Sequence, residues 1–257
     1  MILDDILAEK RRAVSSARLR IPLAEIEARA AAIAPTRGFL ASLRSASGIA
    51  CIAEFKRRSP SKGWIRRAAD VAEVVAAYQR GGASAISVLT DTPFFGGELA
   101  DLTSARAATE LPILRKDFVI DPYQVAEARA AGADALLLIV AALGERDLRE
   151  LLAATRAFGM EALVETHDAD ELRRAIAAGA RVIGVNNRDL RTFHVDTDLA
   201  VELRPQVPGE YLMVAESGVR TADDVQRLRR AGIEAVLVGE ALMRSPDPES
   251  ALRELLA

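Results

Sequence analysis

The sequence contains a single cysteine, only two histidines and few aromatic residues. One cysteine cannot form an intramolecular disulfide, and Cys51 lies inside an apolar segment, which is typical of a small buried side chain. His167 and His194 are far apart and have no spacing typical of metal ligands. We therefore expect no disulfide and no metal site, and we interpret both histidines as loop residues.

The sequence also lacks a signal peptide and any long apolar run. Asp4 and Asp5 interrupt the apolar start, and basic residues follow it, which is the reverse of the order in a secretory signal. No apolar run approaches the roughly 18 residues of a membrane span. The formal net charge is only −3, which argues against a surface that binds nucleic acid or an anionic membrane. We expect a cytoplasmic protein that binds neither.

Lysine is scarce, because only four of the 34 basic residues are lysines: Lys10, Lys56, Lys62 and Lys116. The last three lie at or just after the ends of predicted strands. A desolvated lysine can lose its proton, whereas arginine does not. This placement favours a site that needs a proton donor.

A unit of about 50 residues repeats four times. Each copy has a glycine at the end of a helix, then a small residue and an apolar strand; the four glycines are Gly82, Gly132, Gly179 and Gly232. This period is too long for one strand and one helix and fits two of each. Four further apolar strands are expected between the repeats, at 49–53, 112–115, 160–165 and 211–215.

The helix starts support the same count. Asp70, Asp121, Asp168 and Thr221 each stand three residues before an acid or an amide, which is typical of a helix N-cap. Eight strand–helix units with apolar strands predict a parallel sheet covered by helices. At 257 residues, the length suits a (β/α)8 TIM barrel, with a doubly wound open sheet as the alternative.

We expect one domain over residues 1–257. Residues 1–48 form a helical extension, with helices at 2–17, 22–33 and 39–43, and residues 49–257 form the barrel.

The strand ends carry more ionisable side chains than packing explains. In a barrel these ends converge on one cavity, where each buried charge costs several kcal/mol unless it is paired or used. We therefore predict a site built from Glu54, Lys56, Lys116, Glu165, Asn186 and Glu216.

The last two strands predict an anion site. Ser217, Gly218 and Gly239 lie where the loops after strands 7 and 8 of a barrel offer backbone N–H groups to phosphate, and Lys56 is close in the strand order. The sequence has neither a dinucleotide-binding glycine fingerprint nor a nucleotide-binding P-loop. We expect a phosphorylated small molecule as the substrate.

These residues lie in stretches that resemble the indole-3-glycerol phosphate synthase family. The resemblance covers essentially the whole chain, and it is carried by 53–63 (AEFKRRSPSKG), 87–91 (SVLTD), 94–97 (FFGG), 114–118 (LRKDF), 161–165 (EALVE), 184–190 (GVNNRDL), 215–218 (AESG) and 238–244 (VGEALMR).

The resemblance implies an activity without a cofactor. It would close the ring of 1-(2-carboxyphenylamino)-1-deoxy-D-ribulose 5-phosphate to give indole-3-glycerol phosphate, with loss of CO2 and water, in tryptophan biosynthesis. Lys116 resembles the family's general acid and Glu165 the acid or base of the dehydration. Glu54 and Lys56 would complete the proton-handling pair.

The resemblance also implies the substrate contacts. Asn186 and Glu216 would orient substrate hydroxyls and intermediates, and Arg188 would contact a carboxylate. The other contacts would be Phe95, Phe118 and Leu137 around the anthranilate ring, and Ser217, Gly218 and Gly239 at the phosphate, helped by Lys56 and Ser59. The loop that ends at Gly63 would be a lid, with Trp64 at its base.

Two residues depart from the family pattern. Glu98 and Glu240 each stand where serine is common, so we expect the Glu240 carboxylate to turn away from the phosphate. Two alternative functions remain. A phosphosugar isomerase of the same barrel type would need a Cys or Asp acid–base pair, and Cys51 lies inside a strand. A non-catalytic phosphosugar-binding barrel is the other. We expect a monomer or a weak homo-oligomer.

Overall fold

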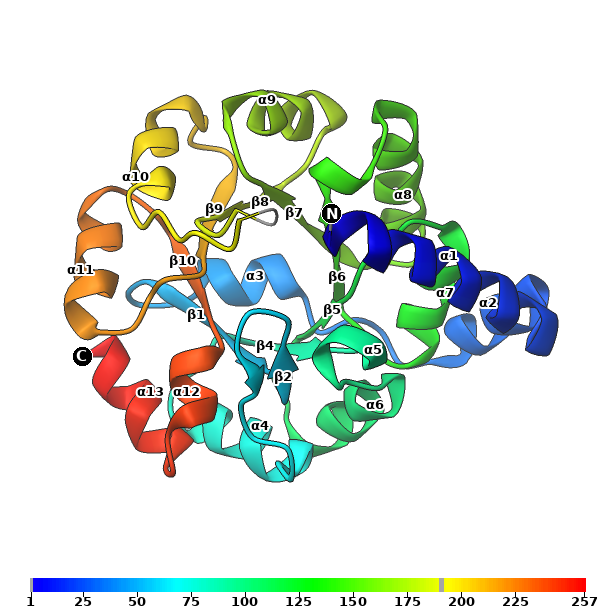
Figure 1. Ribbon diagram of the computed structural model, residues 1–257, viewed down its shortest axis with the longest axis horizontal. Coiled ribbons are helices and arrows are strands. Elements are labelled where there is room, and N and C mark those ends of the chain that lie inside the picture. Colours follow the sequence, from blue (N-terminus) through cyan, green and yellow to red (C-terminus); the bar gives the residue numbers. More distant parts are fainter. Residues whose placement is uncertain (1, 190–191) are drawn as a thin grey trace.

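The computed structural model describes residues 2–189 and 192–257. Their parallel strands close into a barrel in the order β1-β10-β9-β8-β7-β6-β5-β4 (Figure 1). The bounds are β1 Ala50–Phe55, β4 Ala85–Leu89, β5 Ile113–Lys116, β6 Ala135–Ile139, β7 Glu161–Thr166, β8 Val182–Asn186, β9 Leu212–Glu216 and β10 Ala235–Val238. Because β1 pairs with both β10 and β4, the predicted barrel is confirmed and the open sheet is wrong.

The helices lie around the outside of the barrel (Figure 1). They are α4 Val71–Arg80, α6 Leu99–Ala108, α7 Pro122–Ala130, α8 Glu145–Ala157, α9 Ala169–Ala178, α10 Leu199–Leu203, α11 Ala222–Arg230 and α13 Pro248–Leu256. Shorter helices are α5 Thr92–Phe95, η1 Val140–Ala142, η2 Arg204–Gln206 and α12 Glu240–Arg244. Among the described residues, no helix has the length and apolar character needed to cross a membrane.

The four predicted helix starts are confirmed, whereas the first helix runs to Arg20 rather than to residue 17. The side chains of Asp70, Asp168 and Thr221 accept hydrogen bonds from the backbone N–H three residues later, and Asp121 accepts one from Tyr123. The four repeat glycines all have positive φ, between 83° and 97°. The left-handed backbone ends each helix and directs the chain into the next strand.

Side chains at alternate positions along the strands belong to two separate apolar layers. Ile52, Leu114 and Leu163 lie in the cluster inside the barrel, whereas neighbours such as Cys51 and Val164 pack in the cluster beneath the helices. Side chains two residues apart point to the same face, so the interior positions that follow are Glu54, Lys116 and Glu165. The inside of the barrel is therefore apolar at its base and ionisable at the carboxyl ends of the strands.

The strands run further than the sequence suggests. We expected β1 to end at Ala53, β5 at Arg115 and β9 at Ala215, but Glu54, Lys116 and Glu216 lie within the strands. The register pairs Leu89 with Lys116 and Asn186 with Glu216. An ionisable side chain that points into a cavity does not interrupt the hydrogen bonds between strands. The first polar residue was therefore a poor marker of where each strand ends.

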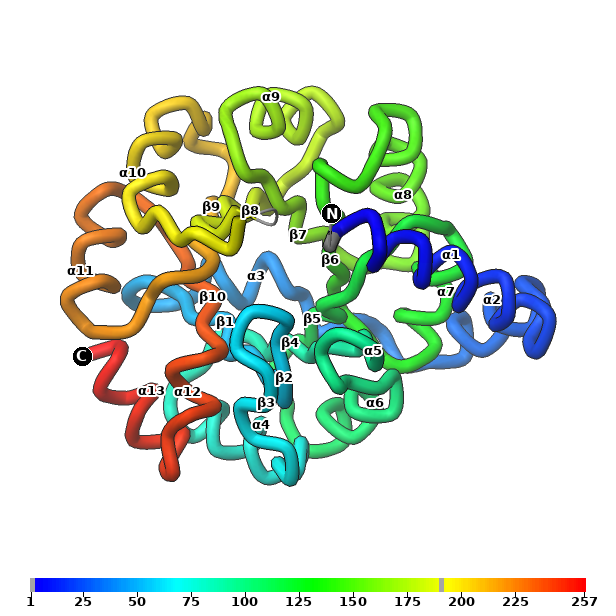
Figure 2. The backbone as a smooth tube through the Cα atoms, in the orientation of Figure 1, coloured from blue at the N-terminus to red at the C-terminus, as the bar shows by residue number. Residues whose placement is uncertain are grey.

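The N-terminal extension is attached to both the side and the base of the barrel. Its helices are α1 Ile2–Arg20, α2 Leu23–Ala32 and α3 Phe39–Arg44. Figure 2 shows α1 and α2 together beside α7, where Val14, Ile26 and Tyr123 form a small buried cluster. Helix α3 packs Phe39 and Leu43 against the interior apolar cluster, opposite the ionisable end.

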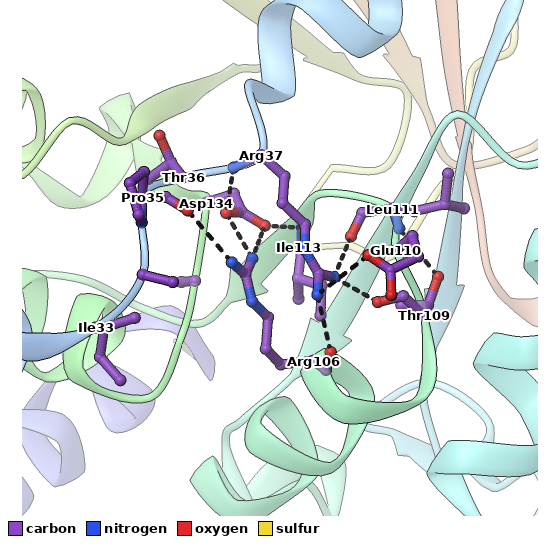
Figure 3. A network of polar contacts seen from close by, with 12 residues as sticks. Ile33, Pro35, Thr36, Arg37, Arg106, Thr109, Glu110, Leu111, Ile113 and Asp134 are labelled. Carbon is purple, nitrogen blue, oxygen red and sulfur yellow. Dashed lines mark hydrogen bonds and ion pairs between the residues drawn. The ribbon is translucent and has the colours of Figure 1, made fainter.

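A buried carboxylate fixes the link between α2 and α3 (Figure 3). Asp134 accepts hydrogen bonds from the backbone N–H of Arg37 at 2.8 Å and of Ile113 at 2.8 Å, and Arg106 Nη1 lies 2.6 Å from its Oδ2. The Arg37 guanidinium in turn donates to the carbonyl of Leu111 at 3.0 Å. The extension and the start of β5 thus share one acceptor.

We expect Asp134→Ala to lower the free energy of unfolding by about 3–5 kcal/mol, because it leaves a partly buried guanidinium and two backbone donors without their acceptor. Urea denaturation would measure this loss. The control is Asp170→Ala, because Asp170 is 80% exposed in its ion pair with Arg173 and should cost less than about 1 kcal/mol. Similar losses in both variants would contradict the assignment.

Candidate active site

A cavity of about 540 Å³ opens at the carboxyl ends of the strands. The structure brings every predicted site residue to its wall: Glu54, Lys56, Ser59, Phe95, Lys116, Phe118, Leu137, Glu165, Asn186, Arg188, Glu216, Ser217, Gly218 and Gly239. Leu190, which ends the 184–190 stretch, lies outside the described residues. The predicted convergence is present, while the chemical roles of these residues stay predictions.

One ammonium group lies between two carboxylates at the centre of the cavity. Lys116 Nζ is 2.9 Å from Glu165 Oε2 and 3.2 Å from Glu216 Oε2. Asn186 Nδ2 donates to the other oxygen of Glu165 at 3.2 Å. Strands β5, β7, β8 and β9 each contribute one of these four side chains.

The two carboxylates respond differently to this arrangement. Burial alone would lower the pKa of Lys116, but Glu165, Glu216 and Glu54 outweigh it and raise that pKa. Burial disfavours the charge of Glu165, yet Lys116 holds its pKa below the usual range. Burial, only partly opposed by Lys116 and aided by Glu165, raises the pKa of Glu216 to about 8. Near neutral pH, Glu165 is therefore charged and Glu216 is protonated.

Two carboxylates lie directly against glycine backbone. A Cβ on Gly184 would be 2.2 Å from Glu216 Oε1, and a Cβ on Gly239 would be 2.5 Å from Glu54 Oε1. Any larger residue would push these side chains out of position. Sequence reasoning missed Gly184, although a glycine inside a buried strand is a signal of close approach.

A second ion pair stands beside the first. Lys56 Nζ is 2.5 Å from Glu54 Oε1, so these two side chains enter the cavity together as predicted. The following loop forms a small hairpin, β2 Arg58–Ser59 with β3 Gly63–Trp64, in front of the barrel mouth (Figure 1). Arg57 holds the hairpin to α6 through two hydrogen bonds with Asp101, at 2.5 and 2.9 Å.

An apolar wall lies on β4 to β6 and the loops that follow these strands. The rings of Phe95 and Phe118 have centroids 6.1 Å apart, and Leu137 lies beside them on the cavity wall. Leu3 and Ile6 of α1 also line the cavity, and sequence reasoning missed both. Their apolar spacing along the first helix was visible, but not the surface that it would cover.

Lys10 attaches α1 to the same strands. Its Nζ lies 3.0 Å from Asp91 Oδ2 and 2.6 Å from Asp117 Oδ1. Asp117 also pairs with Arg115 at 3.0 Å and follows Lys116 directly. The extension therefore braces the end of the strand that carries the central ammonium group.

The segments that follow β9 and β10 form a cationic rim of the cavity. Ser217 and Gly218 have φ of 64° and 88°, a turn that can direct backbone N–H groups toward an anion. Arg220 and Arg244 also line the cavity, and sequence reasoning missed both. Arg244 Nε donates to Glu240 Oε1 at 3.1 Å, so the Glu240 carboxylate is bound along its own helix.

His167 lies in the loop between β7 and α9, as expected, but its ring is close to two carboxylates. Its side chain is 14% exposed, with Nε2 3.3 Å from Glu165 Oε1 and Nδ1 3.0 Å from Glu171 Oε2. Burial would lower its pKa, but these two carboxylates raise it to about 10. Within the described part of the chain, no three or more His, Cys, Asp or Glu residues are grouped so that they could hold a metal ion.

Comparison with known proteins shows the family to which the chain belongs. The family model for indole-3-glycerol phosphate synthase matches residues 3–255. The indole-3-glycerol phosphate synthase of Roseiflexus sp. (strain RS-1) is 53% identical over 262 aligned residues, covering 99% of this chain and 97% of the relative. Indole-3-glycerol phosphate synthase 2 of Streptomyces coelicolor is 53% identical over 255 residues, covering 99% and 98%.

Solved structures match the fold at low sequence identity. Thiamine phosphate pyrophosphorylase from Pyrococcus furiosus aligns with a TM-score of 0.61 and 18% identity, covering 81% of this chain and 94% of that one. The 3-hexulose-6-phosphate synthase from Salmonella typhimurium aligns with a TM-score of 0.63 and 14% identity, covering 80% and 96%. These likenesses concern the barrel alone.

The raised pKa of Glu216 makes stability depend on pH. Since the folded pKa exceeds the unfolded value, the proton on Glu216 stabilises the fold at low pH, and that contribution is lost as pH rises through about 8. Glutamine mimics the protonated form at every pH. Between pH 6 and pH 9, we expect the unfolding free energy of the wild type to fall by roughly 2–3 kcal/mol more than that of Glu216→Gln. This follows from about 1.36 kcal/mol per pKa unit.

Urea denaturation at the two pH values would test this prediction. The exposed Glu202→Gln exchange is the control and should change stability by less than about 0.5 kcal/mol at either pH. A Glu216→Gln difference that does not vary with pH would show that this carboxyl group is already ionised at pH 6.

Proposed function

Since the chain belongs to the indole-3-glycerol phosphate synthase family, we propose that the cavity described above is its active site, with Lys116 as general acid and Glu165 as base. The enzyme is a carboxy-lyase of tryptophan biosynthesis that converts 1-(2-carboxyphenylamino)-1-deoxy-D-ribulose 5-phosphate to indole-3-glycerol phosphate, CO2 and water. The placement of Lys116 between two buried carboxylates, in a cavity with an apolar wall and a cationic rim, carries the proposal.

Lys116 acts first, when the ring closes. The ring carbon that bears the carboxylate attacks the ketone carbon, and negative charge develops on the ketone oxygen. The raised pKa of Lys116 keeps it protonated until that oxygen becomes the stronger base, so the proton is transferred as the carbon–carbon bond forms. The carboxylate then leaves as CO2, and its bonding electrons restore the aromatic ring.

Glu165 acts later, when water is lost. The former ketone oxygen takes a second proton and leaves as water. Lys56, which is paired with Glu54, donates this proton. Glu165, charged in the resting site, removes a proton from the adjacent CH2 carbon, and the second double bond of the five-membered ring forms. The separated pKa values of Glu165 and Glu216 fit one base and one neutral hydrogen-bond donor.

The remaining side chains hold the substrate across the cavity. Phe95, Phe118 and Leu137 wall the aromatic ring, and Arg188 contacts its carboxylate. Ser217, Gly218 and Gly239 bind the phosphate with Lys56 and Ser59, while Asn186 and neutral Glu216 orient the sugar hydroxyls. In the strand order, β7 and β8 separate the two groups on one side and β1 separates them on the other, so the substrate spans the barrel mouth.

One chain supplies all the described residues of this site. We therefore propose that the protein is active as a monomer or a weak homo-oligomer. A cytoplasmic location fits a biosynthetic enzyme with one buried thiol.

Turnover by the purified chain tests the function directly. We expect indole-3-glycerol phosphate to form from the carboxyphenylamino-deoxyribulose phosphate without any added cofactor, followed by the fluorescence of the indole product. Specific activity should not change with protein concentration. Binding of the substrate with no product formed would instead indicate a phosphosugar-binding barrel.

The Lys116→Met variant tests the central role. We expect kcat to fall by at least 10²–10⁴-fold, the usual contribution of a general acid, because methionine fills the space without a proton or a charge. Circular dichroism and the unfolding midpoint would show that the variant folds. Arg146→Met, on the exposed face of α8, is the control and should keep the wild-type rate. A folded Lys116→Met protein with most of its activity would remove Lys116 from the mechanism.

A further inference from the structure

His167 lies behind the proposed base rather than in the cavity. It follows Glu165 by two residues at the end of β7, and it is not among the residues that line the cavity. Its Nε2 is 3.3 Å from Glu165 Oε1, an ion-pair contact without hydrogen-bond geometry, and the same oxygen accepts a hydrogen bond from Asn186 Nδ2. The other oxygen of Glu165 faces Lys116 at 2.9 Å. Any effect of His167 on the substrate must therefore pass through Glu165.

The two ring nitrogens of His167 face two different carboxylates. Nε2 faces Glu165, and Nδ1 lies 3.0 Å from Glu171 Oε2. A neutral imidazole has one N–H and one lone pair, so either tautomer would leave a lone pair 3.0 or 3.3 Å from a carboxylate oxygen. Only the imidazolium, with two N–H groups, suits both partners. Its raised pKa agrees with this reading.

Glu171 is held in place to receive this ring. It lies in the first turn of α9, where its backbone N–H donates to the N-cap Asp168 at 2.8 Å. Its Oε2 also accepts from the backbone N–H of His167 at 2.8 Å. The charged groups that face the imidazole are therefore Glu165 from β7 and Glu171 from α9, with Lys116 of β5 beyond Glu165. A chain of contacts from Glu171 through His167 to Glu165 therefore joins the helix to the site; we call it the Glu171–His167–Glu165 relay.

We propose that His167 is a positioning residue that, as an imidazolium, keeps Glu165 oriented and ionised after Lys116 has given its proton to the substrate. This inference rests on the proposed function. Protonated Lys116 is the nearest cation to Glu165, and its charge disappears when it acts as an acid. The imidazolium then remains as the cation beside Glu165, so the carboxylate stays a base for the dehydration that follows.

The pH dependence of turnover tests this role. We expect His167→Asn to move the acidic limb of the kcat profile upward by about one pH unit or more, because loss of a nearby cation raises the pKa of a carboxyl group. At pH values below the limb, kcat of the variant should be about tenfold lower than that of the wild type. At pH values above the limb, the two kcat values should agree within a few-fold. The matched control is His194→Gln, which removes the other, exposed histidine and should leave the profile unchanged. An even loss at all pH values, with the limb unmoved, would overturn the proposal.

A second measurement needs neither substrate nor the His167 variant. In the His194→Gln protein, the only histidine NMR signal belongs to His167. We expect that signal to show an imidazolium throughout pH 6–8, and Glu171→Gln should lower the pH at which it deprotonates. Loss of the proton near pH 6.5 in the resting protein would overturn the proposal, even if His167→Asn does not fold. Failure of wild-type turnover would instead count against the proposed function and leave this titration as the test of the relay.

Discussion

The unequal sharing of one ammonium group between two buried carboxylates is the constraint on which this site depends. Lys116 keeps Glu165 charged, whereas burial keeps Glu216 protonated near neutral pH, so two identical side chains acquire different chemistry. That outcome requires three strand tips from β5, β7 and β9 to meet within hydrogen-bond distance. The closed barrel supplies this geometry, because its interior positions continue from an apolar base to an ionisable mouth.

The N-terminal extension serves the same constraint from outside the barrel. At the base, Asp134 joins the segment before α3 to the start of β5. At the mouth, Lys10 pairs with Asp117, the residue after Lys116. The strand that carries the central ammonium group is thus bound to the extension near both of its ends. These contacts give the first 48 residues a part in holding Lys116 in place.

Much of the fold could be predicted from local signals in the sequence. The repeat glycines, the capping residues and the apolar strands each report local backbone geometry, and a barrel then follows from their count. The convergence of charged strand ends could be expected because parallel strands end on one side. The contacts between distant residues could not be predicted, since neither the approach of Leu3 to the cavity nor the pairing of Lys10 with Asp117 has a local signal. Glu54, Lys116 and Glu216 were placed after their strands because polarity does not show which way a side chain points.

The contact of Glu54 and Glu216 with glycine backbone bears on how this barrel can be redesigned. Gly239 and Gly184 offer no side chain to trim, and any enlargement displaces a carboxylate. These two positions therefore offer little room for engineering the substrate range. Under the proposed function, Phe95, Phe118 and Leu137 wall the aromatic ring, so shortening them is expected to admit bulkier aromatic groups, which makes the apolar wall the natural place for directed evolution to begin.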